Sequence, residues 1–101
     1  MNISKTLNLY PKPSVTAGVR TTVSTSSVQS GVTFAVTDYY ALVEMQTNDA
    51  YVTFDGTTPS GSNGFKYVAG TREIWSKQRA AAAKFIRVSA DGAVMVSALT
   101  D

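Results

Sequence analysis

Short runs of β-branched and aromatic residues, each ended by Gly, Asn, Asp or Pro, recur along this chain and constrain its fold more than any other feature. Val, Ile, Thr and the aromatic residues make up 38 of the 101 residues, whereas Leu and Glu supply only 4 and 2. The first group suits a pleated, half-buried surface and the second group favours helices. We therefore predict an all-β fold, a compact antiparallel β-sandwich or small barrel of the jelly-roll-like kind.

The clearest strand pattern lies in the middle of the chain. Apolar residues alternate with Thr and Ala from 31 to 37, which predicts a strand with one apolar face. Residues 41–47 and 50–54 predict two further strands, and the Asn48-Asp49 link between them predicts a hairpin.

The second half of the chain adds strands and one helix. Ser76 is a suitable N-cap, and the four alanines that follow at 80–83 favour a short Ala-rich helix near residues 77–84. A helix so short needs packing to persist, and Trp75 and Phe85 at its ends are placed to provide it. The expected strands of this half are 65–69, 71–75, 85–89 and 93–99, with a turn-rich loop at 59–64 and a hairpin turn at Asp91-Gly92.

The apolar positions of these segments predict the core. Each is a large side chain in a predicted strand or beside the helix. The predicted core residues are Phe34, Val36, Val43, Val52, Phe54, Ile74, Trp75, Phe85, Ile86, Val88, Val94 and Val96.

The N-terminal segment looks different from the rest. Pro11 and Pro13 favour extended backbone before them and do not suit a central strand. We interpret residues 1–14 as an extended arm or edge segment, which would order on a neighbouring subunit or pair at a sheet edge. Residues 15–101 are interpreted as a single β-sandwich domain, and within it 17–25 as a polar edge strand.

Composition excludes several kinds of chemistry. The chain has no Cys and no His, so disulfides, thiol catalysis and Ser-His machinery are excluded. Its seven carboxylates are scattered, and no motif matches a calcium or phosphate loop. We predict no catalytic residue, no cofactor and no metal. A hydrolase that uses two carboxylates is a weaker hypothesis and requires them to meet in a pocket.

Charge also limits the partners that we expect. The net charge is +2, and the basic residues concentrate only around the predicted helix, at 77–87, which is ordinary for a solvated face. We therefore expect no nucleic acid as a partner. No apolar run reaches the length of a membrane span, and residues 1–10 do not have the pattern of a signal peptide, so synthesis in a cytoplasm is expected.

Aromatic residues outside the predicted core supply candidate contact sites. Tyr39-Tyr40 would direct one ring to each face of a strand, and such amphipathic rings are common at interfaces. Trp75 is interpreted as a core residue, and the other interpretation places it with the tyrosines in a platform for stacking sugars. The predicted partner-interface residues are Leu7, Leu9, Tyr10, Pro11, Pro13, Tyr39, Tyr40 and Tyr67.

An ordered series of motifs in residues 41–99 resembles a known class of proteins. The series is Tyr-Val-Thr-Phe-Asp-Gly-Thr-Thr-Pro at 51–59, Asn-Gly at 63–64, Gly70, Trp-Ser-Lys at 75–77, and Ala-Ala-Ala-Ala-Lys-Phe-Ile-Arg at 80–87. This series is similar to small virion structural proteins of tailed bacteriophages. The first 40 residues do not contribute to the resemblance.

The resemblance implies a non-enzymatic particle component, most simply a head decoration (cement) protein that binds and stabilises the capsid shell. Its implied partners are the major capsid protein or other virion proteins, and a homo-oligomer would gain avidity on such a lattice. The implied location is the phage particle, after synthesis in the host cytoplasm. The alternative is a carbohydrate- or receptor-binding module of a tail or decoration spike.

Overall fold

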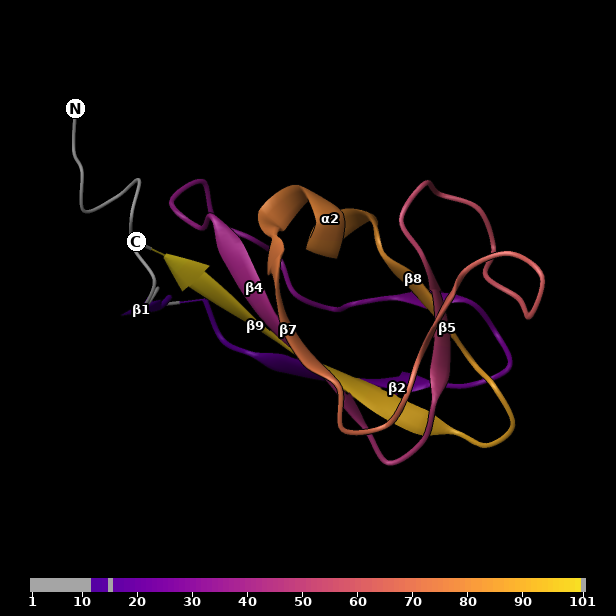
Figure 1. The fold of residues 1–101 in the computed structure, drawn as a ribbon. Helices are drawn as coiled ribbons and strands as arrows, with labels where there is room; N and C mark the ends of the chain where they lie inside the picture. Colours follow the sequence, from indigo (N-terminus) through magenta and orange to yellow (C-terminus); the bar gives the residue numbers. More distant parts are fainter. Residues whose placement is uncertain (1–11, 15, 101) are drawn as a thin grey trace.

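The computed structural model describes residues 12–14 and 16–100 (Figure 1). Over this part of the chain, nine short strands and one short helix follow one another with brief connections. They are β1 (Lys12–Pro13), β2 (Val19–Val23), β3 (Val28–Gln29), β4 (Tyr40–Gln46), β5 (Ala50–Thr53), β6 (Phe65–Tyr67), β7 (Arg72–Ser76), α2 (Lys77–Ala82), β8 (Lys84–Arg87) and β9 (Gly92–Thr100).

The strands form two antiparallel sheets that pack face to face. Sheet A has the order β1-β9-β4-β7, and β2 also pairs with β9 beside β1. Sheet B has the order β3-β8-β5-β6. Figure 1 shows β4, β9 and β7 on one side, β8 and β5 on the other, and α2 at one end of the space between them. The predicted all-β antiparallel sandwich with one short helix is confirmed.

Alternation of side chains builds the interior. Along β4, Ala41, Val43 and Met45 are buried while the residues between them are only half-buried, the pattern of a strand with one face on a core. The polar edge strand expected at 17–25 is confirmed as β2, whose Val23 is buried. The buried core is made of Val23, Ala41, Val43, Met45, Ala50, Val52, Trp75, Ala80, Ala83, Phe85, Val94 and Val96.

Aromatic rings fill the centre of this core. The Trp75 ring stacks on Phe85 with 6.2 Å between centroids and meets Phe54 edge-on at 5.0 Å. Tyr67 also packs edge-on against Trp75, at 5.7 Å. Trp75 is 3% exposed, so its interpretation as a core residue is confirmed and it is not available to stack a sugar.

The helix follows its sequence signals. The Ser76 hydroxyl accepts a hydrogen bond from the Arg79 amide at 3.1 Å, which satisfies one of the free donors of the first turn. Ala80 is buried on the inner face. The helix ends at Ala82, two residues earlier than predicted, because Ala83 adopts extended backbone and begins the passage into β8.

Both predicted hairpins are wrong, because each link carries the chain from one sheet to the other. β4 pairs with β7 and β9, whereas β5 pairs with β6 and β8. A tight two-residue hairpin needs left-handed backbone at its central positions, and none of the four predicted turn residues at 48–49 and 91–92 adopts it. The left-handed residue of the β4–β5 link is Thr47, with a φ of 74°. The two links instead contact each other, since the side-chain amide Nδ2 of Asn48 donates to the Asp91 backbone carbonyl at 2.8 Å.

The strand predicted at 31–37 is also wrong: these residues form a loop. The Asp38 carboxylate accepts a bond from the Ala35 amide at 2.8 Å, and the Asp38 amide donates to the Ala35 carbonyl at 3.0 Å. These bonds close a turn over residues 35–38 and prevent extension. Phe34 still packs against the core, but Val36 is 89% exposed, so its placement in the core is wrong.

Most other core predictions are confirmed, with one exception that follows from strand geometry. Ile74 and Trp75 are neighbours in β7, and neighbours in a strand point to opposite faces. Trp75 takes the inner face, which leaves Ile74 54% exposed on the outer face of sheet A. Val43, Val52, Phe85, Val94 and Val96 are buried, and Ile86 and Val88 are half-buried.

Candidate partner-binding surface

A buried carboxylate organises the end of the sandwich where β1 begins. Asp38 is 0% exposed. It accepts a hydrogen bond from the Ser14 hydroxyl, and another from the Thr16 hydroxyl at 2.9 Å, besides the Ala35 amide already described. A buried charge is tolerated when it is bonded in this way. Asp38 therefore ties the first described residues of the chain to the 35–38 turn.

These bonds also set the protonation state of the site. The side-chain bond from Ser14, with those from Ala35 and Thr16, lowers the pKa of Asp38 below its ordinary value of 3.8, although burial opposes the shift. The positive charge of Lys77 lowers this pKa further. Asp38 is thus held ionised and fully bonded, which is the state of a structural group.

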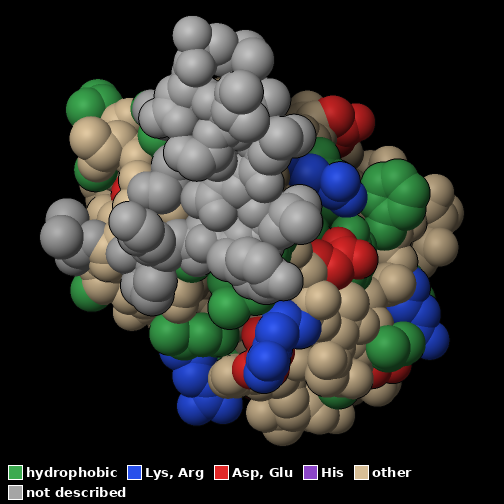
Figure 2. Space-filling model, turned by 60° about the vertical axis from the view of Figure 1, so that its left-hand side comes forward, with side chains coloured by type: hydrophobic (Ala, Val, Ile, Leu, Met, Phe, Trp, Pro, Cys, Tyr) green, Lys and Arg blue, Asp and Glu red, His purple; other side chains and the backbone are tan. Residues whose placement is uncertain are grey.

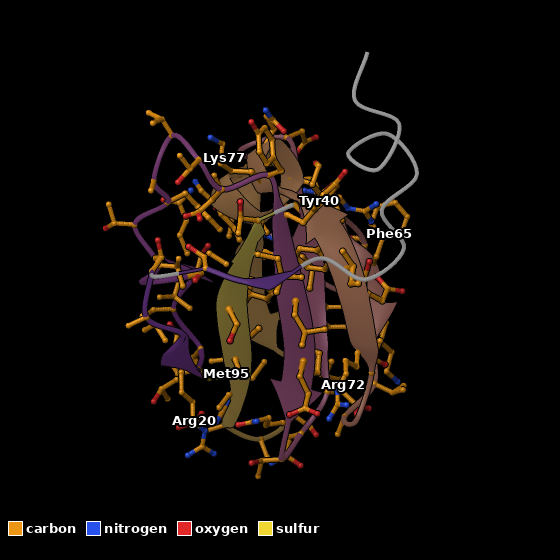
Figure 3. The ribbon with its side chains drawn as sticks, turned by 90° about the vertical axis from the view of Figure 1, so that its left-hand side faces the viewer. Arg20, Tyr40, Phe65, Arg72, Lys77 and Met95 are labelled. Carbon is orange, nitrogen blue, oxygen red and sulfur yellow. The ribbon has the colours of Figure 1, made fainter. Side chains whose placement is uncertain are left out.

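Further bonds hold the same turn against β9 and α2. The Thr100 hydroxyl donates to the Thr37 carbonyl at 3.0 Å, and the Lys77 ammonium donates to the Ala35 carbonyl at 3.4 Å. Figure 3 shows Lys77 and Tyr40 at this end of the molecule, away from Arg20 and Arg72. We call this region, made of Ser14, Ala35–Tyr39 and Thr100, the arm end.

The arm end displays apolar side chains to solvent. Val36 is 89% exposed and Tyr39 is 42% exposed. Beside them lies an open hollow of about 370 Å³ between the loop and helix α2. Its lining residues are Val32, Phe34, Ala35, Val36, Lys77, Gln78 and Ala81. A rigid turn with exposed apolar groups and an adjacent apolar hollow is suited to contact with another protein surface.

The structure brings some of the predicted interface residues together. Pro13 pairs in register with Leu99, and Tyr40 pairs with Leu99 from the other side, so both lie at the arm end with Tyr39. Tyr67 does not: it packs on Trp75, its hydroxyl contacts the Arg79 guanidinium at 3.2 Å, and burial raises its pKa above 10.0. Leu7, Leu9, Tyr10 and Pro11 lie outside the described residues.

A second hollow, of about 350 Å³, lies at the 55–64 loop. Its apolar part is formed by Phe54 and Phe65, whose rings are 6.0 Å apart, and Phe65 is 63% exposed. The Arg79 guanidinium covers the Phe54 ring at 4.1 Å. Thr53, Asp55, Asn63 and Gly64 complete the lining.

The loop beside this second hollow is held by its own polar groups. The Asp55 carboxylate accepts bonds from the Thr57 amide and hydroxyl at 3.1 and 2.6 Å, which lower the pKa of Asp55 below 3.8. The Asn63 amide donates to Thr57 and Thr58. The site offers an aromatic face with a carboxylate and an amide oxygen beside it, a combination that suits a ligand rich in hydroxyl groups.

The carboxylates of the described chain are engaged in structural bonds. Glu44 binds Arg72 at 2.7 Å, and Asp91 binds Arg87 at 2.8 Å. Asp49 lies 3.9 Å from Lys66, and Glu73 accepts from the Trp75 indole at 2.8 Å. Within residues 12–14 and 16–100 no group of three acidic residues is placed to hold a metal ion, and no helix is long and apolar enough to cross a membrane.

Comparisons with known proteins add no relationship: no family model, no curated protein and no solved structure matches this chain. The resemblance of residues 41–99 to virion proteins therefore stays a prediction from the motifs alone.

Sequence reasoning missed Asp38 and the exposure of Val36. The sequence signal was the position of Asp38, an acidic residue between the alternating residues 31–37 and the strand predicted at 41–47. An aspartate there can bond the backbone a few residues before it and end the run in a turn. Its bonds to Ser14 and Thr16 join residues more than twenty positions apart, and no local pattern indicates them.

Proposed function

We propose that this chain is a non-enzymatic structural protein of a phage virion, most simply a decoration protein that binds the capsid shell through its arm end. The partner is the major capsid protein or another virion protein. Binding stabilises the shell by mass action, since a ligand of the assembled state shifts the equilibrium toward that state.

The observation that carries this proposal is the construction of the arm end. Val36 and Tyr39 are exposed side chains in and directly after the 35–38 turn. Hydrogen bonds to the buried Asp38 carboxylate hold this turn in place. The first described residues of the chain are attached to the same end of the sandwich, through the pairing of β1 with β9 and the bond from Thr16 to Asp38. A prearranged apolar surface loses little conformational entropy on binding.

The surface composition supports a role in packing against other subunits. Charged residues make up only 16% of the chain, against about 25% in an average domain. On the described part of the face in Figure 2, Lys, Arg, Asp and Glu side chains are scattered among uncharged atoms. A partner that meets such a face removes few charges from water, which lowers the desolvation cost of contact.

Cosedimentation of the purified protein with capsids tests the proposal. Val36→Asp should weaken binding at least tenfold, because it places a charge in the contact. Ala90→Asp is the matched control: it adds the same charge at an exposed position in the β8–β9 link, at the opposite end of β4, and should bind as wild type. Equal binding of wild type and Val36→Asp would contradict the arm end as the contact surface.

Deletion of residues 1–11 tests the part that the N-terminal segment plays. This deletion leaves the bond between Ser14 and Asp38 in place, so the sandwich should keep its melting temperature. We expect capsid binding to fall while circular dichroism stays unchanged. Unchanged capsid binding by the shortened chain would remove the N-terminal segment from the proposal.

The second hollow favours a second candidate function, the binding of a carbohydrate. Phe65 offers an exposed ring beside the acceptor groups of Asp55 and Asn63, and sugars present both an apolar face and hydroxyl donors. A glycan array with wild type and Phe65→Ala tests it. A glycan that binds wild type and loses the variant would support this function, and a blank array would contradict it.

A further inference from the structure

The outer edge of β7 carries backbone groups that nothing in the described chain pairs. Among the described residues β4 is the only strand partner of β7. The amide of Lys77 donates to Tyr39 and the amide of Met45 donates to Thr71. These bonds show that the odd-numbered residues of this segment face β4. The backbone groups of Arg72 and Ile74, and the amide of Ser76, therefore point away from the sheet.

On the opposite side of the sandwich, the chain's own segments cover the edges of the sheets. There the chain passes from β2 to β3, and the amide of Gly31 donates to the Thr21 hydroxyl at 3.2 Å. The amide of Arg87 in β8 donates to the Ser24 carbonyl at 2.9 Å. The β7 side has no comparable cover within the described residues. Val68, in the link from β6 to β7, and Ile74, in β7 itself, are each more than half exposed.

We propose that two copies of this chain associate by antiparallel pairing of their β7 strands, with the two-fold axis passing at Ile74. Ile74 then faces Ile74 of the second copy and exchanges both backbone bonds with it, while the Ser76 amide of each copy faces the Arg72 carbonyl of the other. The four-strand path of sheet A continues across the axis into the second copy. This pairing does not rest on the proposed function, although it would supply that function with avidity.

The sequence of β7 favours this register over its neighbours. Residues whose backbone groups point away from β4 must pair with such residues of the second copy. The possible registers therefore differ by shifts of two residues between the two strands. Moving the axis one residue toward Arg72 places Glu73 opposite Glu73, and like charges directly opposite are destabilising. Moving the axis one residue toward Ser76 places Trp75 opposite Trp75. Fewer β7 residues then pair, and α2 is brought into the contact. The axis at Ile74 opposes Glu73 to Trp75 and Arg72 to Ser76, with no like-charged pair.

The side chains of this edge suit a second copy. Ile74 is 54% exposed on the outer face and lies in register with the half-buried Leu42. Arg72 is already neutralised by Glu44, so it does not repel a second β7. Figure 3 shows Arg72 near the margin of the sheet that β7 forms. Because the strands are antiparallel, the two arm ends lie at opposite ends of the joined sheet. The dimer could therefore contact two separate binding sites, one with each arm end.

Cross-linking at single cysteines tests the register, because the natural chain has none. Opposed Ile74 positions would lie about 5.5 Å apart between Cα atoms, within disulfide range. Arg72 positions would be about 14 Å apart, because four residues along a strand span about 13 Å and paired strands lie about 5 Å from each other. Mild oxidation should therefore convert Ile74→Cys to a covalent dimer at least tenfold faster than Arg72→Cys, the matched control. Equal rates for the two variants, or no dimer of Ile74→Cys, would overturn the proposal.

The oligomeric state in solution and the cross-linking of a shortened chain test the same pairing. Native mass spectrometry should find wild type as a dimer and Ile74→Pro as a folded monomer, since proline removes only the outward amide and leaves the ladder to β4 intact. A monomeric wild type at tens of micromolar would overturn the pairing. The Ile74→Cys cross-link should also form at the same rate when residues 1–11 are deleted. A cross-link that forms only after this deletion would show that the N-terminal segment, not a second β7, occupies this edge in the full chain. Capsids take no part, so these outcomes are independent of the proposed function.

Discussion

At the scale of single residues, Asp38 does most to shape the candidate surface. Its bonds join the start of the described chain to the 35–38 turn and so decide where Val36 and Tyr39 are displayed. The sequence indicated only an interruption at this position, because an aspartate's partners are set by where distant segments lie. The sequence predicted that Tyr39 and Tyr40 would point to opposite faces of a strand but did not say which ring would be exposed. In the structure Tyr39 is 42% exposed and Tyr40 is half-buried.

The lowered pKa of Asp38 gives a pH-dependent prediction. A carboxyl group whose pKa is lowered by folding stabilises the protein above its unfolded pKa, and that contribution is lost as the pH falls through the folded value. We expect Asp38→Asn to lower the melting temperature by several degrees at pH 7. The difference from wild type should shrink as the pH falls below 3.8 and through the lowered pKa of Asp38, where the wild-type carboxylate also gains a proton. Thermal scans across this range measure it, and a difference that stays constant with pH would contradict the assignment.

The Phe85 ring gives a prediction for the core. It is 0% exposed and stacks on Trp75, so Phe85→Ala should lower the free energy of unfolding by about 3–5 kcal/mol. Urea denaturation followed by the fluorescence of the single tryptophan measures the loss. Val36→Ala serves as control and should change the free energy by less than about 0.5 kcal/mol, since Val36 is almost fully exposed.

At the scale of elements, local signals predicted most strands and the helix but not how they pair. The hydroxyl of Ser76 caps α2 as expected, because capping involves residues three positions apart. The links at 48–49 and 91–92 were expected to be hairpins and instead connect the sheets. A turn dipeptide indicates that the chain turns. Whether the next strand pairs with its neighbour depends on which strands already occupy the edges of that sheet.

The helix cap gives an element-scale prediction. Ser76→Ala removes the side-chain acceptor of the Arg79 amide and should lower the free energy of unfolding by about 1 kcal/mol. Ser89→Ala, at an exposed position between β8 and β9, is the matched control and should be nearly neutral. Chemical denaturation of both variants checks this, and an equal effect of the two substitutions would show that the cap contributes nothing.

The contact between the links at 48–49 and 91–92 gives a second prediction at the scale of elements. A Cβ atom at Gly92 would lie 3.0 Å from the Gln46 carbonyl and 3.1 Å from the Asn48 carbonyl, and backbone atoms have little room to move. Gly92→Ala should therefore destabilise the protein by about 1–3 kcal/mol. Gly61→Ala meets only the Tyr51 side chain at 3.4 Å and should change the melting temperature little. Thermal unfolding of both variants distinguishes the positions; equal melting temperatures would contradict close packing of the links.

At the scale of the whole molecule, a sandwich with few charges and an open β7 side is suited to assembly with other subunits. The net charge of +2 is small, so long-range electrostatics contribute little to association. We expect capsid binding to change less than about threefold between 0.05 and 0.5 M NaCl. Binding isotherms at several salt concentrations measure it. A steep fall of log affinity with log salt would instead indicate neutralisation of phosphates, as for a nucleic-acid partner.

The sequence by itself determined the fold class, most strand positions, the capped helix and the burial of Trp75. These follow from propensity and from the two-residue period of strands, which act between near neighbours. The tertiary structure alone decided that 31–37 is a loop, that the 48–49 and 91–92 links connect different sheets, and that Asp38 accepts hydrogen bonds from Ser14 and Thr16. Those outcomes depend on contacts between distant segments, where satisfying a buried carboxylate and closing the core outweigh the local preference of a short alternating run.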